Sequence, residues 1–343
     1  MKKRSPALIL VAALGLGACT AAFPVAAPDQ PMPHRAVSAI DGAAFEFLLA
    51  EQRRLHAVAL PVLRGAVEFC GGDTKFFFGL STAIADTFEG ETRDIAVAIR
   101  GLDQTVRVLY TVPGSPAEQA GLRRGDSIIS VAGRALPPGE AGSRLLFGAM
   151  EASRGEPLPL TIRRDGIRRT AAVSPVAICD VPVELARTGE VYAWTNGAKV
   201  KIAEGMLRFA ATDPELALVV SHELAHIILN HTGSFFGVGT ARLEREADYV
   251  GLYILARGGF DLERGVRLFD RMSVAFPKLD EAASHPPLRA RLRALRDTAR
   301  EITDRVDAGL PLVPDSYRAR LLGADRVAQR NPHSGPGENS FLP

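Results

Sequence analysis

The feature that most constrains this chain is an acidic residue flanked by two histidines inside an apolar run. Residues 216–229 are mainly apolar and helix-compatible, and they contain His222, Glu223 and His226. Residues four apart in a helix share one face, so both histidines can direct their imidazoles at one metal ion. Glu223 lies one position beyond the first histidine, where it can act on a water molecule without being a ligand. Chance produces this pattern in roughly one such chain in a hundred, so the surrounding sequence has to decide.

A third metal ligand is expected downstream, because a catalytic zinc ion has three protein ligands and one open coordination position. Residues 244–255 form a second helix-compatible run. Glu244 and Asp248 in this run are four residues apart and share a helix face. Glu246 is a competing candidate for the third ligand.

Two motifs together, H-E-x-x-H at residues 222–226 and E-x-x-A-D at residues 244–248, resemble the HtpX-like and CAAX-prenyl-protease-like zinc metallopeptidases, metallopeptidase family forty-eight. In that family the Glu of the second motif is the third zinc ligand, and its Asp orients a ligand histidine. The resemblance therefore implies that Glu244 completes the metal site and that Asp248 supports it. The family spacing favours Glu244 over Glu246.

Residues 284–291 extend the resemblance, since the chain has S-H-P-P-L-R-A-R where the family has S/T-H-P-x-x-x-x-R. This implies that His285 contacts zinc in a resting state or faces the oxyanion of the transition state, with Arg291 nearby. A loop histidine before a helix is the alternative, because free and bound geometries differ. His231, five residues after His226, is off the ligand face and is expected to cap the helix or support a ligand.

A second resemblance covers residues 106–133. Residues 114–126, G-S-P-A-E-Q-A-G-L-R-R-G-D, closely resemble a motif of bacterial PDZ domains, and short strand-like runs separated by Gly and Pro surround them. The resemblance implies a groove helix at residues 141–152 and a final hairpin at residues 158–173.

PDZ domains bind an extended peptide as an added strand and hold its terminal carboxylate on backbone N–H groups. The loop expected to do this consists of Phe78, Gly79 and Leu80. Residues 81–104 are longer and more polar than such a domain needs. A PDZ-shaped spacer that binds nothing is the alternative.

The N-terminus resembles a bacterial lipoprotein signal. Basic residues 2–4 precede an apolar run at residues 7–18 that is too short to span a bilayer as a mature helix. The run ends in L-G-A-C, which implies cleavage before Cys19 and lipidation of that residue. Thr20 rather than Asp follows, which favours the outer membrane, facing the periplasm. Ordinary secretory cleavage and an uncleaved anchor are the alternatives.

Removing the leader also changes the charge balance. The formal net charge of +2 includes the basic residues 2–4, so the mature chain is close to neutral and no nucleic-acid partner is expected. No later run reaches the roughly 18 apolar residues that a membrane span needs. The membrane is therefore expected to be a partner only through the N-terminal lipid.

With Cys19 lipidated, Cys70 and Cys179 remain, one on each side of the PDZ-like region. An exported chain lives in an oxidising compartment. A disulfide between them would join the two ends of an inserted domain, whose termini are normally close. Two unpaired, buried thiols are the alternative.

Other elements follow from local patterns. Apolar spacing predicts one or two helices over residues 36–69, with a break near Pro61. Residues 190–202 predict a hairpin around an Asn-Gly turn, and by resemblance its second strand is the substrate-binding edge. Residues 212–215, T-D-P-E, form a capping sequence for the metal helix.

The expected fold is α+β, with a mainly helical zincin-type metallopeptidase domain that has a small sheet, and an inserted β-rich PDZ-like domain. The expected segments are a signal peptide (1–18), a tether (19–35), the N-terminal helical part of the peptidase (36–75), the PDZ-like domain (76–175), the metallopeptidase domain (176–329) and a disordered tail (330–343).

The resemblance implies an endopeptidase with one Zn2+ per chain that acts on misfolded or unassembled envelope proteins. Zinc and Glu223 would activate water, and the PDZ domain would bind substrate or regulator peptides by their C-termini. A periplasmic chaperone or assembly factor, in which PDZ binding dominates and proteolysis is minor, is the alternative. A tethered module with a vestigial metal site is a third possibility, against which the intact motifs argue.

Overall fold

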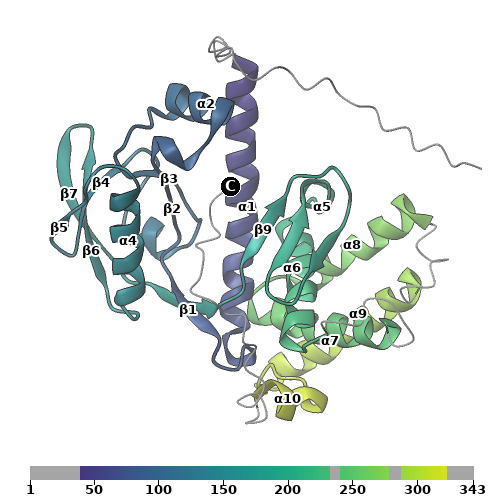
Figure 1. Cartoon of the computed structure of the whole chain (residues 1–343). Coiled ribbons are helices and arrows are strands. Elements are labelled where there is room, and N and C mark those ends of the chain that lie inside the picture. The colour runs from purple at the N-terminus through teal and green to yellow at the C-terminus, as the bar shows by residue number, and fades with distance from the viewer. Residues whose placement is uncertain (1–38, 232–239, 278–286, 323–343) are drawn as a thin grey trace, which may run out of the picture. The chain divides into compact units, whose positions relative to one another are not determined.

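The computed structural model describes residues 39–231, 240–277 and 287–322, all within one compact unit, Val37–Pro343 (Figure 1). The predicted signal peptide, Cys19, the tether, the tail and His285 lie outside the described residues. The α+β fold is confirmed. Within the described ranges, no helix has both the length and the apolar character needed to cross a bilayer.

The described helices are α1 (Ala39–Gly65), η1 (Val67–Phe69), η2 (Ala85–Thr87), α2 (Gly90–Arg100), α3 (Pro116–Gln119), α4 (Glu140–Ala152), α5 (Glu204–Phe209), α6 (Asp213–Ile228), α7 (Thr240–Arg257), α8 (Leu262–Ala275), α9 (Leu288–Asp307), η4 (Asp315–Tyr317) and α10 (Arg318–Leu322). The described strands are β1 (Thr74–Phe77), β2 (Leu80–Ala83), β3 (Arg107–Thr111), β4 (Ser127–Val131), β5 (Arg134–Ala135), β6 (Leu158–Arg164), β7 (Ile167–Val173), β8 (Val176–Cys179), β9 (Val183–Ala186), β10 (Ala193–Thr195) and β11 (Val200–Ala203).

The PDZ-like region is a six-stranded antiparallel sheet in the order β2-β3-β4-β6-β7, with β5 paired to β4. It has a hydrophobic core of its own, which includes Val108, Ile128 and Leu160. The predicted final hairpin is confirmed as β6 and β7. Its turn residues, Asp165 and Gly166, both have positive φ, as a tight two-residue hairpin requires. The predicted groove helix is α4 to within one residue.

A two-stranded ribbon leads into and out of this sheet. β1 pairs antiparallel with β8, so that Thr74 lies opposite Cys179. The structure contains the expected disulfide between Cys70 and Cys179, whose Cα atoms are 5.8 Å apart. The cross-link closes a sequence separation of 109 residues, which contributes about 4–5 kcal/mol in the chain-entropy model. The predicted domain boundaries at residues 76 and 175, which fall within and just before this ribbon, stay predictions.

Helix α1 is continuous through Pro61, which corrects the predicted break at that residue. A proline inside a helix removes one backbone hydrogen bond and costs about 3 kcal/mol. Its neighbours Leu60 and Val62 are only 4% and 0% exposed. Burying one such side chain contributes about 1.5–3 kcal/mol. The core around α1 therefore offsets the lost hydrogen bond and keeps the helix intact.

The small sheet has the order β10-β11-β9. β10 and β11 form the predicted hairpin, with Trp194 opposite Lys201. β9, which the sequence did not single out, pairs with β11 in parallel. The predicted substrate-binding edge is therefore wrong, because β11 is paired on both sides and the described edges of this sheet are β10 and β9. The parallel pairing involves segments that no short-range pattern links, so it was not predicted.

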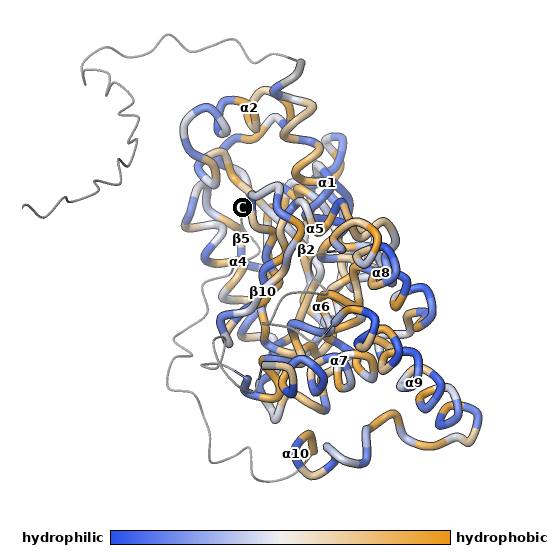
Figure 2. Tube along the Cα trace, turned by 90° about the vertical axis from the view of Figure 1, so that its right-hand side faces the viewer, coloured by the Kyte–Doolittle hydropathy of each residue, from blue (hydrophilic) through white to orange (hydrophobic). Residues whose placement is uncertain are grey.

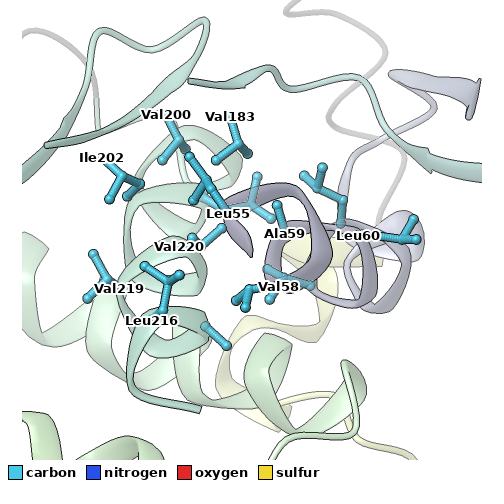
Figure 3. Close-up of a cluster of buried hydrophobic side chains, with 14 of the residues drawn as sticks. Leu55, Val58, Ala59, Leu60, Val183, Val200, Ile202, Leu216, Val219 and Val220 are labelled. Carbon is cyan, nitrogen blue, oxygen red and sulfur yellow. The ribbon is translucent and has the colours of Figure 1, made fainter. Parts of the chain in front are cut away.

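One face of the small sheet packs on two helices, as Figure 3 shows. The side chains that meet there come from the sheet, from α1 and from α6: Val183, Val200, Ile202, Leu55, Val58, Ala59, Leu60, Leu216, Val219 and Val220. α6 also packs against α7 and α8, and α9 covers both of those helices (Figure 1). α9 is mostly hydrophilic along its length (Figure 2), and its buried residues include Leu295 and Ile302.

His56 joins three parts of the fold. Its Nδ1 lies 3.0 Å from the hydroxyl of Tyr110 on β3, and it also has a hydrogen bond to the backbone of Val183 on β9. His56 is only 7% exposed. Burial lowers the pKa of this imidazole to about 4, although the Val183 hydrogen bond opposes the shift.

The pKa of His56 predicts a pH-dependent loss of stability. Below its ordinary pKa of about 6.5 the unfolded chain binds a proton that the folded chain does not bind until about pH 4, so stability falls as the pH falls through this window. The free energy of unfolding should fall by about 2 kcal/mol more in the wild type than in His56→Phe between pH 7.5 and pH 5. Denaturant titrations of both proteins measure the difference, and parallel pH profiles would contradict it.

Candidate metal centre

The two motif histidines lie on α6, whose start is fixed by a capping box. The hydroxyl of Thr212 accepts a hydrogen bond from the Glu215 N–H, and the Glu215 carboxylate accepts one from the Thr212 N–H. Arg271 on α8 also donates to Glu215 at 2.7 Å. With the helix start fixed, His222 and His226 share a face, and their ring centroids are 4.7 Å apart.

Helix α7 crosses α6 at close range beside His222. A Cβ atom on Gly251 would lie only 3.1 Å from the Cα atom of His222 and 3.2 Å from its backbone nitrogen. The absence of a side chain at Gly251 therefore permits this approach. One and two turns earlier on α7, Asp248 and Glu244 face the histidines of α6.

The structure brings His222, His226 and Glu244 together. Their ligand atoms all lie within 4.8 Å of one another. The two Nε2 atoms are 3.1 Å apart, and each is 3.4 Å from a different carboxylate oxygen of Glu244. Ligands of one tetrahedral zinc ion, about 2.0–2.1 Å from the metal, are separated by about 3.3 Å. The number, chemistry and spacing of these donors therefore fit a zinc ion with an open fourth position.

Asp248 and Arg291 support His222. The Nδ1 atom of His222 lies 3.0 Å from Asp248, although not in the direction of a well-aligned hydrogen bond. Arg291 on α9 donates two hydrogen bonds to Asp248, at 2.8 and 2.7 Å, and its guanidinium stacks over Phe269. The guanidinium is also 3.4 Å from Glu244. Arg291 therefore holds both carboxylates against the histidine pair.

The protonation of the ligands follows from these contacts. Burial lowers the pKa of His222, but the close carboxylates of Asp248 and Glu244 outweigh it and raise the pKa to about 10. Burial raises the pKa of Glu244, but hydrogen bonds to His222 and His226 and the charge of Arg291 hold it far below its usual range. Glu244 is therefore an anionic donor, and a metal ion has to displace the proton of His222.

Glu223 lies on α6 next to the first ligand and is partly buried. Burial raises the pKa of its carboxyl group, and the charge of Glu244 adds to the shift. The charges of His222, His226 and Arg291 oppose it. A carboxylate with a raised pKa is a better proton acceptor, which suits a general base.

Glu246, the competing candidate for the third metal ligand, is not part of the group formed by the three candidate ligands. Its carboxylate lies 3.2 Å from Nε2 of His231, and Arg242 also donates to it. His231 in turn lies 3.0 Å from Nδ1 of His226. Burial, followed by the charge of His226, lowers the pKa of His231 to about 4. The sequence suggested a supporting role for His231, but nothing in the residue spacing pointed to its partnership with Glu246.

The PDZ-like region has a separate pocket at the predicted carboxylate loop. Residues 75–82, which include Phe78, Gly79 and Leu80, line it together with Phe147 and Met150 of α4. Gly79 has a φ of 75°, and a Cβ there would lie 2.0 Å from Cβ of Ser115, so only glycine fits. Both α4 residues lie on the predicted groove helix, but no local pattern singled them out, because facing positions on a helix and a distant strand share none.

Comparisons with known proteins agree with both regions. Residues 180–240 match the model of Peptidase family M48, and residues 107–164 match that of the PDZ domain. The chain therefore contains one segment similar to M48 peptidases and one similar to PDZ domains. The M48 match includes the H-E-x-x-H motif and ends before Glu244, so the assignment of the third ligand depends on geometry and on the E-x-x-A-D motif.

Two relatives are mitochondrial metalloendopeptidases named OMA1. The protein of Schizosaccharomyces pombe is 24% identical over 29% of this chain and 41% of its own length. That of Saccharomyces cerevisiae is 27% identical over 22% of this chain and 32% of its own length. The similarity thus spans less than half of these relatives. One solved structure with similarity to this chain is the crystal structure of the HtrA3 PDZ domain bound to a phage-derived ligand. The sequence identity is 24%, the alignment covers 31% of this chain and 89% of that chain, and the TM-score is 0.24.

Loss of a single donor should abolish stable metal binding. His222→Ala and Glu244→Ala each leave two protein ligands, so purified protein should contain close to zero zinc where the wild type contains about one ion per chain. Elemental analysis measures this content, and circular dichroism checks the fold. His56→Phe is the matched control, because it removes a buried histidine outside the centre and should keep its zinc. A full zinc complement in either donor variant would refute the assignment.

Proposed function

We propose that this protein is a zinc-dependent metalloendopeptidase. The observation that carries the proposal is the convergence of two imidazoles and one carboxylate beside Glu223. The M48 match and the metalloendopeptidase relatives support the same class of reaction. His222, His226 and Glu244 would hold the metal, and Asp248 and Arg291 would orient these ligands through direct contacts.

The chemistry combines a Lewis acid with a general base. Bound zinc would polarise the peptide carbonyl and lower the pKa of a water molecule towards about 7. Glu223 would accept a proton from the attacking water molecule and would then donate it to the leaving amine. His285 is proposed from the family resemblance as a stabiliser of the oxyanion.

An extended peptide has two binding surfaces available. β10 is one edge of the small sheet and packs against α6, so an added strand along it would run beside the metal helix. The PDZ pocket offers an apolar wall, formed by Phe147 and Met150, next to the Gly79 loop. We propose misfolded or unassembled proteins of a bacterial envelope as substrates, with this chain anchored through a lipid on Cys19 at the outer membrane, facing the periplasm.

The second candidate is a chaperone or assembly factor whose PDZ domain binds peptides while proteolysis is minor. The PDZ pocket favours it, because this pocket is separate from the metal centre and needs no metal to bind a peptide. The two functions differ in whether they require the general base.

Removal of the general base separates catalysis from binding. Glu223→Gln keeps the size of the side chain but cannot accept a proton, so hydrolysis of unfolded casein should slow by about 10²–10⁴-fold while zinc content and thermal stability stay unchanged. A chelator should produce the same loss in the wild type, and restored zinc should reverse it. Unchanged hydrolysis by the variant would refute the role of Glu223. Full rescue of a deletion strain by Glu223→Gln would favour the chaperone.

A charge in the PDZ pocket should weaken peptide binding. Phe147→Asp places a carboxylate in the apolar wall and should reduce affinity for a peptide with an apolar C-terminal residue by at least about tenfold. Ala141→Asp, on an exposed position of the same helix, is the matched control and should have no effect. Fluorescence anisotropy with free and amidated peptides measures both the pocket and the carboxylate requirement. Equal affinities for all three proteins would refute a binding role.

A further inference from the structure

We propose that His231 and Glu246 are positioning residues that fix the tautomer and orientation of the ligand His226. This inference rests on the proposed metal site. The three groups form a continuous line inside the protein. Nδ1 of His226 lies 3.0 Å from Nδ1 of His231, and Nε2 of His231 lies 3.2 Å from the carboxylate of Glu246. The residues are 5%, 6% and 9% exposed.

When His231 is neutral, the order of donors and acceptors along this line has one solution. The Glu246 carboxylate can only accept, so Nε2 of His231 carries the hydrogen. Neutral His231 then has a lone pair on Nδ1, and Nδ1–H of His226 donates to it. Nε2 of His226 is left with its lone pair on the side of His222 and Glu244. This is the tautomer that a metal ligand needs.

The helix end explains why His231 can reach His226. The N–H of His231 donates to the carbonyl of His226 at 2.9 Å, and the N–H of Asn230 donates to that of Ile227 at 2.9 Å. Asn230 has a φ of 51°, in the left-handed region. Together these features form a Schellman motif, which turns the chain back over the last turn of the helix. The five-residue spacing of the histidines therefore brings their rings together, with centroids 5.1 Å apart.

Two arginines hold Glu246 in place. Arg242, one turn earlier on α7, donates to one carboxylate oxygen at 2.5 Å, and Arg320 on α10 lies 3.4 Å from the other. Arg320 also donates to the carbonyl of Leu229 at the end of α6. The hydroxyl of Tyr317 is a further hydrogen-bond partner of Glu246. The carboxylate is thus tied to both α7 and the end of the metal helix.

The two ligand histidines are therefore supported in different ways. Asp248 reaches His222 directly, whereas Glu246 reaches His226 through the ring of His231. Partners that orient a ligand histidine typically change metal affinity by about 10–100-fold when they are removed. The same range is expected for the line through His231.

The test compares variants that keep or remove the acceptor beside His226. His231→Phe keeps the ring but cannot accept a hydrogen bond, so zinc affinity should fall by about 10–100-fold. His231→Asn can place its side-chain oxygen near the position of Nδ1 and should stay within about threefold of the wild type. In Glu246→Ala no carboxylate determines which nitrogen of His231 carries the hydrogen, so zinc affinity should fall by about tenfold. His56→Phe, a buried histidine elsewhere, should have no effect.

Zinc affinity is measured on the full chain by competition with a chromophoric chelator, and the visible spectrum of Co2+-loaded protein reports ligand geometry. Wild-type affinity in His231→Phe, or an equal loss in His231→Phe and His231→Asn, would overturn the proposal. If His231→Phe does not fold, wild-type affinity in Glu246→Ala would overturn it instead. His222→Ala distinguishes failure of the metal site from failure of the positioning role. If His222→Ala keeps its zinc, the assigned metal site is wrong. If His222→Ala loses its zinc while His231→Phe has wild-type affinity, only the positioning role is rejected.

Discussion

The arrangement of the metal centre depends on contacts between carboxylates and imidazoles that are buried together between α6 and α7. Moving such groups out of water costs several kcal/mol for each charge, and only close partners offset the cost. Glu244 lies against both imidazoles, and Asp248 has a bidentate pair with Arg291. Gly251 lets the two helices approach closely enough for these contacts. Replacing buried ion pairs by apolar contacts is often neutral or stabilising, so this arrangement is better explained by the chemistry it permits than by stability.

The sequence predicted most accurately what local rules determine. Residues 212–226 carry their own start signal and a four-residue histidine spacing, and helix geometry alone then puts two imidazoles on one face. The hairpin of β6 and β7 was implied by the PDZ resemblance, and its contiguous strands and Asp-Gly turn also obey a local rule. The link to Glu244 needed the E-x-x-A-D motif, since the pairing of α6 with α7 is not encoded by a short-range pattern.

The errors and omissions come from long-range packing. The break expected at Pro61 does not occur, because core contacts on both sides of the helix outweigh one lost hydrogen bond. β11 was taken as an edge because its parallel partner, β9, has no distinctive sequence. Glu246 was weighed as a ligand, whereas its side chain points to His231. Its direction depends on how α7 lies against the end of α6, which spacing along α7 cannot specify.

The connection between the PDZ sheet and the metal centre is short and cross-linked. Residues of β1 line the peptide pocket, and β8 is hydrogen-bonded to β1 along its length. Cys179 ends β8 with a disulfide, and β9 begins four residues later and pairs with the small sheet beside α6. His56 contacts β3 on one side and β9 on the other. A ribbon closed by a disulfide and packed against a helix is stiffer than a flexible linker, and dense interiors transmit displacement. The pocket is therefore linked to the small sheet through a paired and cross-linked ribbon, which a PDZ module serving only as a tethered spacer would not require.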